Sequence, residues 1–355
     1  YKTTVNGHVT GGPAYYIRAA FKGKVGKVLA TVFSVLIILA LGFMGNMVQS
    51  NSIGDAFHNA FGLNRLAVGV VVAAIAAFIF LGGVQRIAAV TEKVVPIMAA
   101  FYILGCIAIL VINAKALPGA LAQVFVLAFE PQAMAGGIAG VTVQQSMRFG
   151  VARGLFSNEA GMGSTPHAHA LAKVKTPHEQ GVIAMTGVFL DTFVVLTMTA
   201  LVVISTLYAG GGILSGGAAA GVSKTNMAQL AFGSAFGNEE LGSAFVAICL
   251  CFFAFSTILG WNLFGKLNVE WLFRGKKKLA TALYAALAVG FVVLGSLLSN
   301  DLVWELTDLF NQLMVLPNAL ALFALSGTAV AAARGKASVC AAKEAPAADI
   351  SRQGR

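Results

Sequence analysis

Charged residues are scarce in this chain. Asp, Glu, Lys and Arg make up only 11% of its 355 residues, whereas a soluble globular domain carries about 25%. Apolar residues account for 58% of the sequence, and the mean hydropathy is +0.82. This composition excludes a soluble globular protein and indicates an all-α polytopic membrane protein.

Several chemical signatures are also missing. The four cysteines, at positions 106, 249, 251 and 340, lack the spacing of a metal site, and we expect no disulfide framework. The sequence has no GxxxxGK[ST] motif, which excludes ATP-driven transport by this chain. No Ser/His/Asp or paired-carboxylate arrangement stands out, so we predict that the protein is not an enzyme and needs no cofactor. The chain opens at Tyr1, without an initiator Met, and we expect it to be part of a longer protein.

Long apolar runs dominate what is present. A transmembrane helix needs about 20 consecutive apolar residues, and eight runs meet this criterion. We predict a single transmembrane domain over 1–332, followed by a disordered cytoplasmic tail over 333–355. The predicted spans cover roughly residues 27–49, 66–85, 94–113, 134–150, 180–208, 241–263, 279–298 and 309–331.

The basic residues are distributed unevenly between these spans. If the C-terminus is cytoplasmic, all but three of the 24 Lys and Arg residues fall on the cytoplasmic side, the exceptions being Arg65, Lys115 and Lys224. This asymmetry supports the span count and the orientation, because cytoplasmic loops are enriched in Lys and Arg. The net charge of +10 is then explained by topology and by contact with lipid headgroups, without nucleic-acid binding.

The segment 149–164, FGVARGLFSNEAGMGS, interrupts the apolar pattern with glycines and with Arg153, Asn158 and Glu159. A polar, Gly-rich break in a membrane helix is tolerated only where it lines a cavity or is buried in protein, and transporters hold ligands at such breaks. The orientation above places the charged end of this break on the cytoplasmic side. We therefore assign Arg153, Asn158 and Glu159 to an inner gate and to helix docking.

Two other spans contain polar groups that are costly in a bilayer. Asn46 and Gln49 share one helical face near the end of the first span. This face suits either the carboxylate and amine of a zwitterion or hydrogen bonds between helices. Asp191 lies among apolar residues of the fifth span. It has either a structural hydrogen bond or a coupling or gating role, with Arg153 and Glu159 as candidate partners.

The sixth span carries Ser256, Thr257 and Trp261. Hydroxyl oxygens suit Na⁺, a hard cation, although both hydroxyls could equally bond to the preceding helical turn. Trp261 either walls a small pocket or anchors the helix at the membrane interface. Asp301, Glu305 and Asp308 cluster near the outer end of the last span, where a solvated rim is favoured over a chemical role. His167 and His169, after the break, are assigned to a cytoplasmic loop in preference to a metal site.

Taken together, several strings resemble the alanine or glycine:cation symporters, also called the sodium:alanine symporter family. The segment GLFSNEAGMGS is specific on its own, and the matches run from end to end of the chain. The matching segments are GGPAYYI (11–17), GNMVQSNSI (45–53), GGVQRIAAVTEKVVPIMA (82–99), GVARGLFSNEAGMGSTPHAHA (150–170), QGVIAMTGVFLDTFVVLTMTALV (180–202), FFAFSTILGW (252–261) and LPNALALFALS (316–326).

The resemblance implies a sodium-coupled importer of small neutral amino acids, such as alanine or glycine, in a bacterial or archaeal plasma membrane. It also implies the leucine-transporter-type fold, with two inverted five-helix repeats around a site near the membrane midplane. By this analogy the eight spans are core helices three to ten. Family members carry about three more spans before GGPAYYI, including the first core helix. The alternative is a nontransporting amino-acid receptor or an inactive truncated paralogue.

When the site positions of the family are transferred to this sequence, the resemblance suggests two sets of binding residues. The substrate pocket would be formed by Asn46, Gln49, Phe149, Phe156, Thr257 and Trp261. The sodium site would use Ser256 and Thr257.

Overall fold

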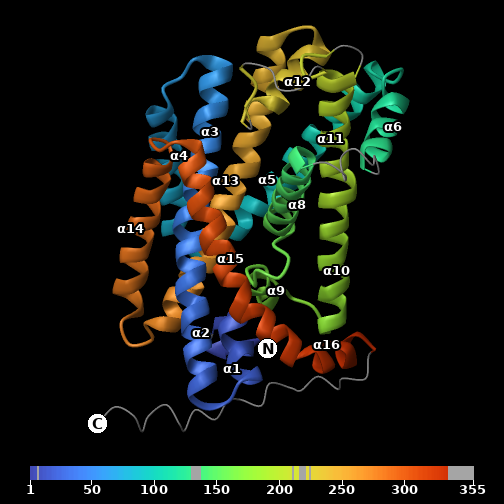
Figure 1. Cartoon of the computed structure of the whole chain (residues 1–355). Helices are drawn as coiled ribbons and strands as arrows, with labels where there is room; N and C mark the ends of the chain where they lie inside the picture. Colours follow the sequence, from blue (N-terminus) through green and yellow to red (C-terminus); the bar gives the residue numbers. More distant parts are fainter. Residues whose placement is uncertain (6–7, 129–136, 210–211, 216–220, 224, 335–355) are drawn as a thin grey trace.

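The computed structural model describes residues 1–5, 8–128, 137–209, 212–215, 221–223 and 225–334, and these are almost entirely helical (Figure 1). The all-α prediction is confirmed apart from a short antiparallel hairpin of β1 (Thr3–Val5) and β2 (His8–Thr10). The helices are α1 (Pro13–Ala20), α2 (Gly23–Ile37), η1 (Ile38–Gly45), α3 (Asn46–Phe61), α4 (Arg65–Leu81), α5 (Gly83–Ile112), α6 (Leu117–Ala128), α8 (Gly137–Asn158), α9 (Pro166–Leu171), α10 (Pro177–Phe189), η2 (Leu190–Leu196), α11 (Thr197–Val203), η3 (Ile204–Tyr208), α12 (Met227–Phe236), α13 (Glu239–Leu272), α14 (Lys277–Gly295), α15 (Asn300–Ala324) and α16 (Ser326–Ala333).

The protein is a multi-pass membrane protein, but fewer helices than predicted meet the criteria for a span. Within the described residues, six helical stretches are long and apolar enough, against the eight predicted. The predicted span 66–85 forms α4, which is only 17 residues long because the chain turns at Gly82 and Gly83, the latter with φ of +68°. The described part of the predicted span 134–150, residues 137–150, belongs to α8, where arginines and glutamines lower the hydropathy. The six stretches are Gly23–Phe61, Gln85–Ile112, Pro177–Tyr208, Glu239–Leu272, Lys277–Gly295 and Asn300–Ala324.

Two of these spans contain π-helical turns. The stretch Gly23–Phe61 is one continuous helix in which η1 separates α2 from α3, and η2 similarly interrupts the stretch that begins with α10. A π-helical turn disturbs the regular i→i−4 hydrogen bonding and is frequently found at functional sites. Gly42 and Gly45 lie in η1, and Asp191 lies in η2.

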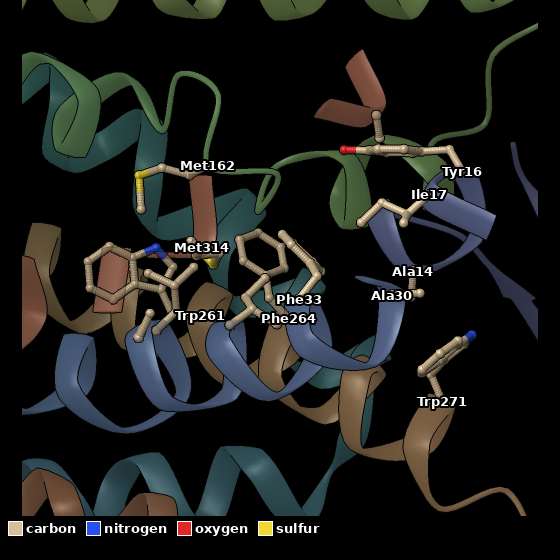
Figure 2. Packing of buried hydrophobic residues seen from close by; sticks show 14 residues of the cluster. Ala14, Tyr16, Ile17, Ala30, Phe33, Met162, Trp261, Phe264, Trp271 and Met314 are labelled. Atoms are coloured by element: carbon tan, nitrogen blue, oxygen red, sulfur yellow. The ribbon is translucent and has the colours of Figure 1, made fainter. Parts of the chain in front are cut away.

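Helix α13 is the central element of the packing. Its residues belong to three separate buried clusters: Trp261 and Phe264 to one with α1, α2 and α15, Ile258 to a second with α4, and Cys249 to a third with α12. Asn238 caps the helix by accepting a hydrogen bond from the Leu241 amide at 3.0 Å, which satisfies one of the free N–H groups of the first turn. Figure 2 shows Trp261, Phe264 and Met162 within the first cluster.

The predicted helix break is present but shorter than expected. Helix α8 continues to Asn158, so only residues 159–165 leave the helix, and the first half of the predicted break is helical. Glu159 has φ of +49°, Gly161 of +73° and Gly163 of +80°. Left-handed backbone is strained for any residue except glycine. The chain therefore uses two glycines and one strained glutamate to reverse direction here.

Close contacts fix the position of this break. A Cβ atom on Gly163 would lie 2.9 Å from Pro13 of α1 and 2.9 Å from Asn318 of α15. The Asn318 amide donates to the Gly161 carbonyl at 2.8 Å, and Tyr16 of α1 donates its hydroxyl hydrogen to the Asn318 side-chain oxygen. The break is thus held against α1 and α15 by both packing and hydrogen bonds.

Candidate functional site

A cavity of about 340 Å³ lies where the end of α8 meets α10, η2 and the middle of α13. Figure 1 shows α8 lying between the bundle that contains α15 and the long helix that begins with α10. The volume lies at the small end of the range for ligand pockets, about 300–1,000 Å³. The lining residues are Ser157, Asn158, Glu159, Thr165, Gly187, Val188, Asp191, Thr257, Gly260, Trp261 and Phe264.

The lining of this cavity contains two acidic residues. Glu159 and Asp191 both contribute carboxyl groups, and the described lining includes neither Lys nor Arg. Asn158 and Thr257 add an amide and a hydroxyl. In the low dielectric of a membrane protein interior, such a lining favours a cation or the ammonium group of a zwitterion.

The polar groups of the break and η2 bond to each other across the cavity edge. Ser157 donates to Asp191 at 2.8 Å, and Thr192 donates to the Asn158 side-chain oxygen at 2.9 Å. The prediction that Arg153 or Glu159 partners Asp191 is therefore wrong, because the serine hydroxyl lies closer in the fold. These two bonds join the last turn of α8 to η2.

Glu159 lies at the centre of a second set of bonds. Its carboxylate accepts a hydrogen bond from the Trp261 indole N–H at 2.5 Å and another from the Ser164 hydroxyl. The sequence analysis assigned Glu159 to gating and Trp261 to the substrate pocket. The structure brings the two side chains into direct contact.

The indole of Trp261 is also confined on its other sides. Phe156 meets it edge to face, with ring centroids 5.4 Å apart and an interplanar angle of 82°. A Cβ atom on Gly45 would lie 2.6 Å from the indole ring, so only glycine fits there without a shift. Phe156 itself is not among the described residues that line the cavity; it packs behind Trp261.

Two other predicted substrate residues, Asn46 and Gln49, do not line this cavity. Asn46 is fully buried and donates to the Gly42 carbonyl at 2.8 Å, which fits the structural interpretation of its amide. Neither Asn46 nor Gln49 is among the described lining residues. The side chain of Phe149 lies outside the part of the chain that the structure describes.

The two predicted sodium ligands, Ser256 and Thr257, have different surroundings. Thr257 lines the cavity, whereas Ser256 contacts the Met98 sulfur of α5 at 3.9 Å. Both hydroxyls donate to the Phe253 carbonyl at 2.9 Å, as expected for bonding to the preceding turn. The oxygen of Thr257 keeps lone pairs available for a cation at the cavity wall.

Arg153 forms an ion pair with Asp308 of α15, and its guanidinium carbon lies 4.2 Å from the centre of the Trp304 ring. Asp308 lies about 12 Å from the start of α15, at 1.5 Å per residue. The two side chains meet along the candidate span that contains α15. The inner-gate role of Arg153 and the solvated-rim role of Asp308 stay predictions. Their pairing joins α8 to α15.

His167 lies in α9 rather than in a loop, and it is buried. Its ring nitrogens contact the Ser164 carbonyl and the Asn268 amide, each at 2.8 Å. Burial lowers the pKa of His167 to about 4, because the charged form loses its hydration. The imidazole is therefore neutral at pH 7 and serves as a hydrogen-bonding link between the break and α13.

Sequence analysis missed several residues of this region. Gly187 and Gly260 line the cavity from two spans, and isolated glycines inside apolar spans were the available signal for a close approach or an open space. Ser157 and Thr165 also line it. Nothing in the local sequence distinguishes these two from other hydroxyl residues.

Comparison with known proteins matches the sequence of this chain to one family. The model for the sodium:alanine symporter family matches residues 1–348. The chain belongs to this family. Its members include a sodium/alanine symporter, AgcS, of Methanococcus maripaludis, which is 38% identical over 92% of this chain and 69% of its own length. The resemblance seen in the sequence is confirmed, and the family consists of transporters rather than enzymes.

Two relatives from Bacillus subtilis show the same extent of match. The amino-acid carrier protein AlsT is 38% identical over 93% of this chain and 66% of its own length. The probable sodium/glutamine symporter GlnT is 39% identical over 91% of this chain and 63% of its own length. The chain thus spans about two thirds of the length of the curated relatives it matches.

Proposed function

We propose that this protein is a Na⁺-coupled symporter that imports a small neutral amino acid, alanine or glycine, across the plasma membrane of a bacterium or archaeon. Transport would proceed by alternating access in a leucine-transporter-type fold of two inverted repeats, with the C-terminus in the cytoplasm. The observation that carries the proposal is the small cavity with two carboxyl groups at the broken end of α8. Broken helices near the midplane are where transporters of this general type hold substrate and coupling ion.

The lining residues suit the two ligands. The carboxyl group of Asp191 favours a cation such as an ammonium group or Na⁺, whereas both carboxyl oxygens of Glu159 already accept hydrogen bonds from Trp261 and Ser164. The hydroxyl of Thr257 is an oxygen ligand of the kind that hard cations prefer. Trp261 and Phe264 add apolar walls for a short side chain. The names of the relatives, which mention sodium with alanine or glutamine, support the choice of substrate class.

The direct test is uptake by the protein reconstituted into proteoliposomes. We expect an inward Na⁺ gradient to drive accumulation of radiolabelled alanine, and unlabelled glycine to compete. Uptake that persists after complete replacement of Na⁺ and dissipation of any proton gradient contradicts the coupling. Binding of alanine without uptake or counterflow identifies a nontransporting receptor instead.

The role of Thr257 has its own prediction. Replacing its hydroxyl by a methyl group in Thr257→Val should raise the Na⁺ concentration for half-maximal uptake about tenfold, because loss of one bond to a charged group costs about 1.5–3 kcal/mol. The matched control is Thr281→Val in α14, whose hydroxyl makes the same type of bond, to the Lys277 carbonyl at 2.8 Å, far along the chain from the cavity residues. An unchanged Na⁺ dependence in Thr257→Val removes this residue from the sodium site.

A further inference from the structure

The contact between Glu159 and Trp261 joins an irregular segment of the chain to a long regular helix. Glu159 belongs to the irregular segment between α8 and α9, whereas Trp261 lies in α13, a regular helix that contributes to three buried clusters. Both line the same cavity. Their hydrogen bond is therefore a direct link between the break and one wall of the proposed binding site.

The backbone at Glu159 indicates that this link is specific. Among the described residues, Glu159 is the one non-glycine residue with positive φ, at +49°. A residue held in this region costs free energy and persists only where its surroundings require it. Here the left-handed backbone directs the carboxyl group to the Trp261 indole and to the Ser164 hydroxyl at once.

The indole has one polar atom, and Glu159 binds it. The other sides of the ring are occupied by the Phe156 ring and by the backbone of Gly45. These apolar contacts limit where the ring can lie, but they do not select one of its two faces. The hydrogen bond to the Nε1 atom selects the orientation, since indole has a single donor.

We propose that Glu159 is a positioning residue that fixes the orientation of the Trp261 indole at the cavity wall and transmits movement of the break to that wall. The inference rests on the proposed function, because the cavity is taken as the amino-acid site. When the break moves away from α1 and α15, the carboxylate moves with it, and the indole loses its orienting bond. The shape of the cavity thus follows the position of the break.

Fluorescence of Trp261 tests the contact without any substrate. The chain has three tryptophans, so Trp271→Phe with Trp304→Phe leaves Trp261 as the sole reporter. In this background Glu159→Ala should shift the emission of Trp261 to longer wavelength and increase its quenching by acrylamide about threefold, since an indole without its acceptor is no longer held in place and becomes more accessible to water. Glu159→Gln should stay close to the unmodified protein, because its amide oxygen still accepts the bond.

Kinetics test the consequence for substrate in the otherwise unmodified protein. Glu159→Ala should raise KM for alanine about tenfold with a smaller change in maximal rate, the effect of one lost hydrogen bond. Glu159→Gln should recover most of this loss. The matched control is Glu240→Ala, an exposed glutamate in the first turn of α13, which should leave both KM and the fluorescence unchanged.

Several outcomes overturn the proposal. Unchanged fluorescence and KM in Glu159→Ala would show that the bond does not orient the indole, and identical behaviour of Glu159→Gln and Glu159→Ala would show that charge matters rather than the bond. If Glu159→Ala does not fold, Ser164→Ala replaces it, because this variant removes the other hydrogen bond of Glu159. Ser164→Ala should leave the emission of Trp261 unchanged. A shift of the emission in Ser164→Ala counts against the proposal. Absence of alanine transport by the unmodified protein contradicts the proposed function, while the fluorescence still decides the role of Glu159.

Discussion

Gly45 lies at a position of the site where no side chain would fit. The Trp261 ring occupies the space where a Cβ atom would lie, 2.6 Å away. Because Gly45 belongs to η1 and Trp261 to α13, the glycine allows two spans to approach at the cavity wall. The tryptophan then has its apolar face against a helix backbone and its N–H on Glu159.

Gly45→Ala should therefore disturb the site and the stability together. Inserting a methyl group into a filled contact costs about 1–3 kcal/mol, and we expect a lower melting temperature in detergent and a raised KM for alanine. Gly290→Ala in α14 is the matched control, since nothing lies within 4 Å of its added Cβ and alanine favours a helix over glycine by about 1 kcal/mol. Equal effects of the two substitutions would contradict the assigned contact.

For individual side chains, the sequence indicates which residues belong to the site but not which of them pair. The types of residue at the site could be predicted: Thr257, Trp261, Glu159 and Asp191 were all selected, since polar and aromatic groups inside spans require an explanation. Their pairings could not, because Glu159 and Trp261 are 102 residues apart in the chain. The bond from the Asn46 amide could not be predicted either, since its acceptor, the Gly42 carbonyl, is backbone and leaves no trace in the pattern of side chains. The role of Asn46 as a substrate ligand stays a prediction.

At the scale of elements, α8 and α15 are joined by the pair of Arg153 and Asp308. The side chains are 37% and 26% exposed, so solvent screens their attraction, and a pair of this kind contributes about 1 kcal/mol or less. The Trp304 ring beneath the guanidinium adds a cation–π contact. The pair is thus weak enough to separate when α8 moves.

A double-mutant cycle with Arg153→Ala and Asp308→Ala should give a coupling energy of about 1 kcal/mol in thermal unfolding, and each single variant should change the rate of alanine uptake. The ion pair of Arg65 and Asp55, at 2.9 Å between α4 and α3, provides the control. Its variants should alter stability without altering uptake. Additive effects of Arg153→Ala and Asp308→Ala would show that the two helices are not coupled through this pair.

The elements themselves were predicted unevenly. Long apolar spans such as α5, α13 and α14 could be predicted because uninterrupted hydropathy defines them. The π-helical turns η1 and η2 could not, since their sequences, ILALGFMG and LDTFVVL, are ordinary apolar runs. The break was located but drawn too long, because glycines such as Gly150 and Gly154 stay helical, and only Gly161 and Gly163 adopt the backbone that ends the helix.

The whole molecule has two ends that differ in charge and in structure. In Figure 1 the loop between α13 and α14 lies at one end, together with α1 and α16, and α6 and α12 lie at the other. The loop between α13 and α14, with the first turn of α14, carries Arg274 and Lys276 to Lys278. Because cytoplasmic loops are rich in Lys and Arg, we propose that this end is cytoplasmic and that the turn before α6 lies outside.

Labelling with a membrane-impermeant maleimide tests this orientation on intact cells. After the native cysteines are replaced by serine, Lys115→Cys, an exposed position between α5 and α6, should react in intact cells, and Lys276→Cys, exposed at the start of α14, only after permeabilisation. The reason is that moving the basic loop across the bilayer against the membrane potential costs about 2.3 kcal/mol per charge and 100 mV. The reverse labelling pattern would invert the molecule, and the cavity at the end of α8 would then have to be approached by substrate from the opposite side.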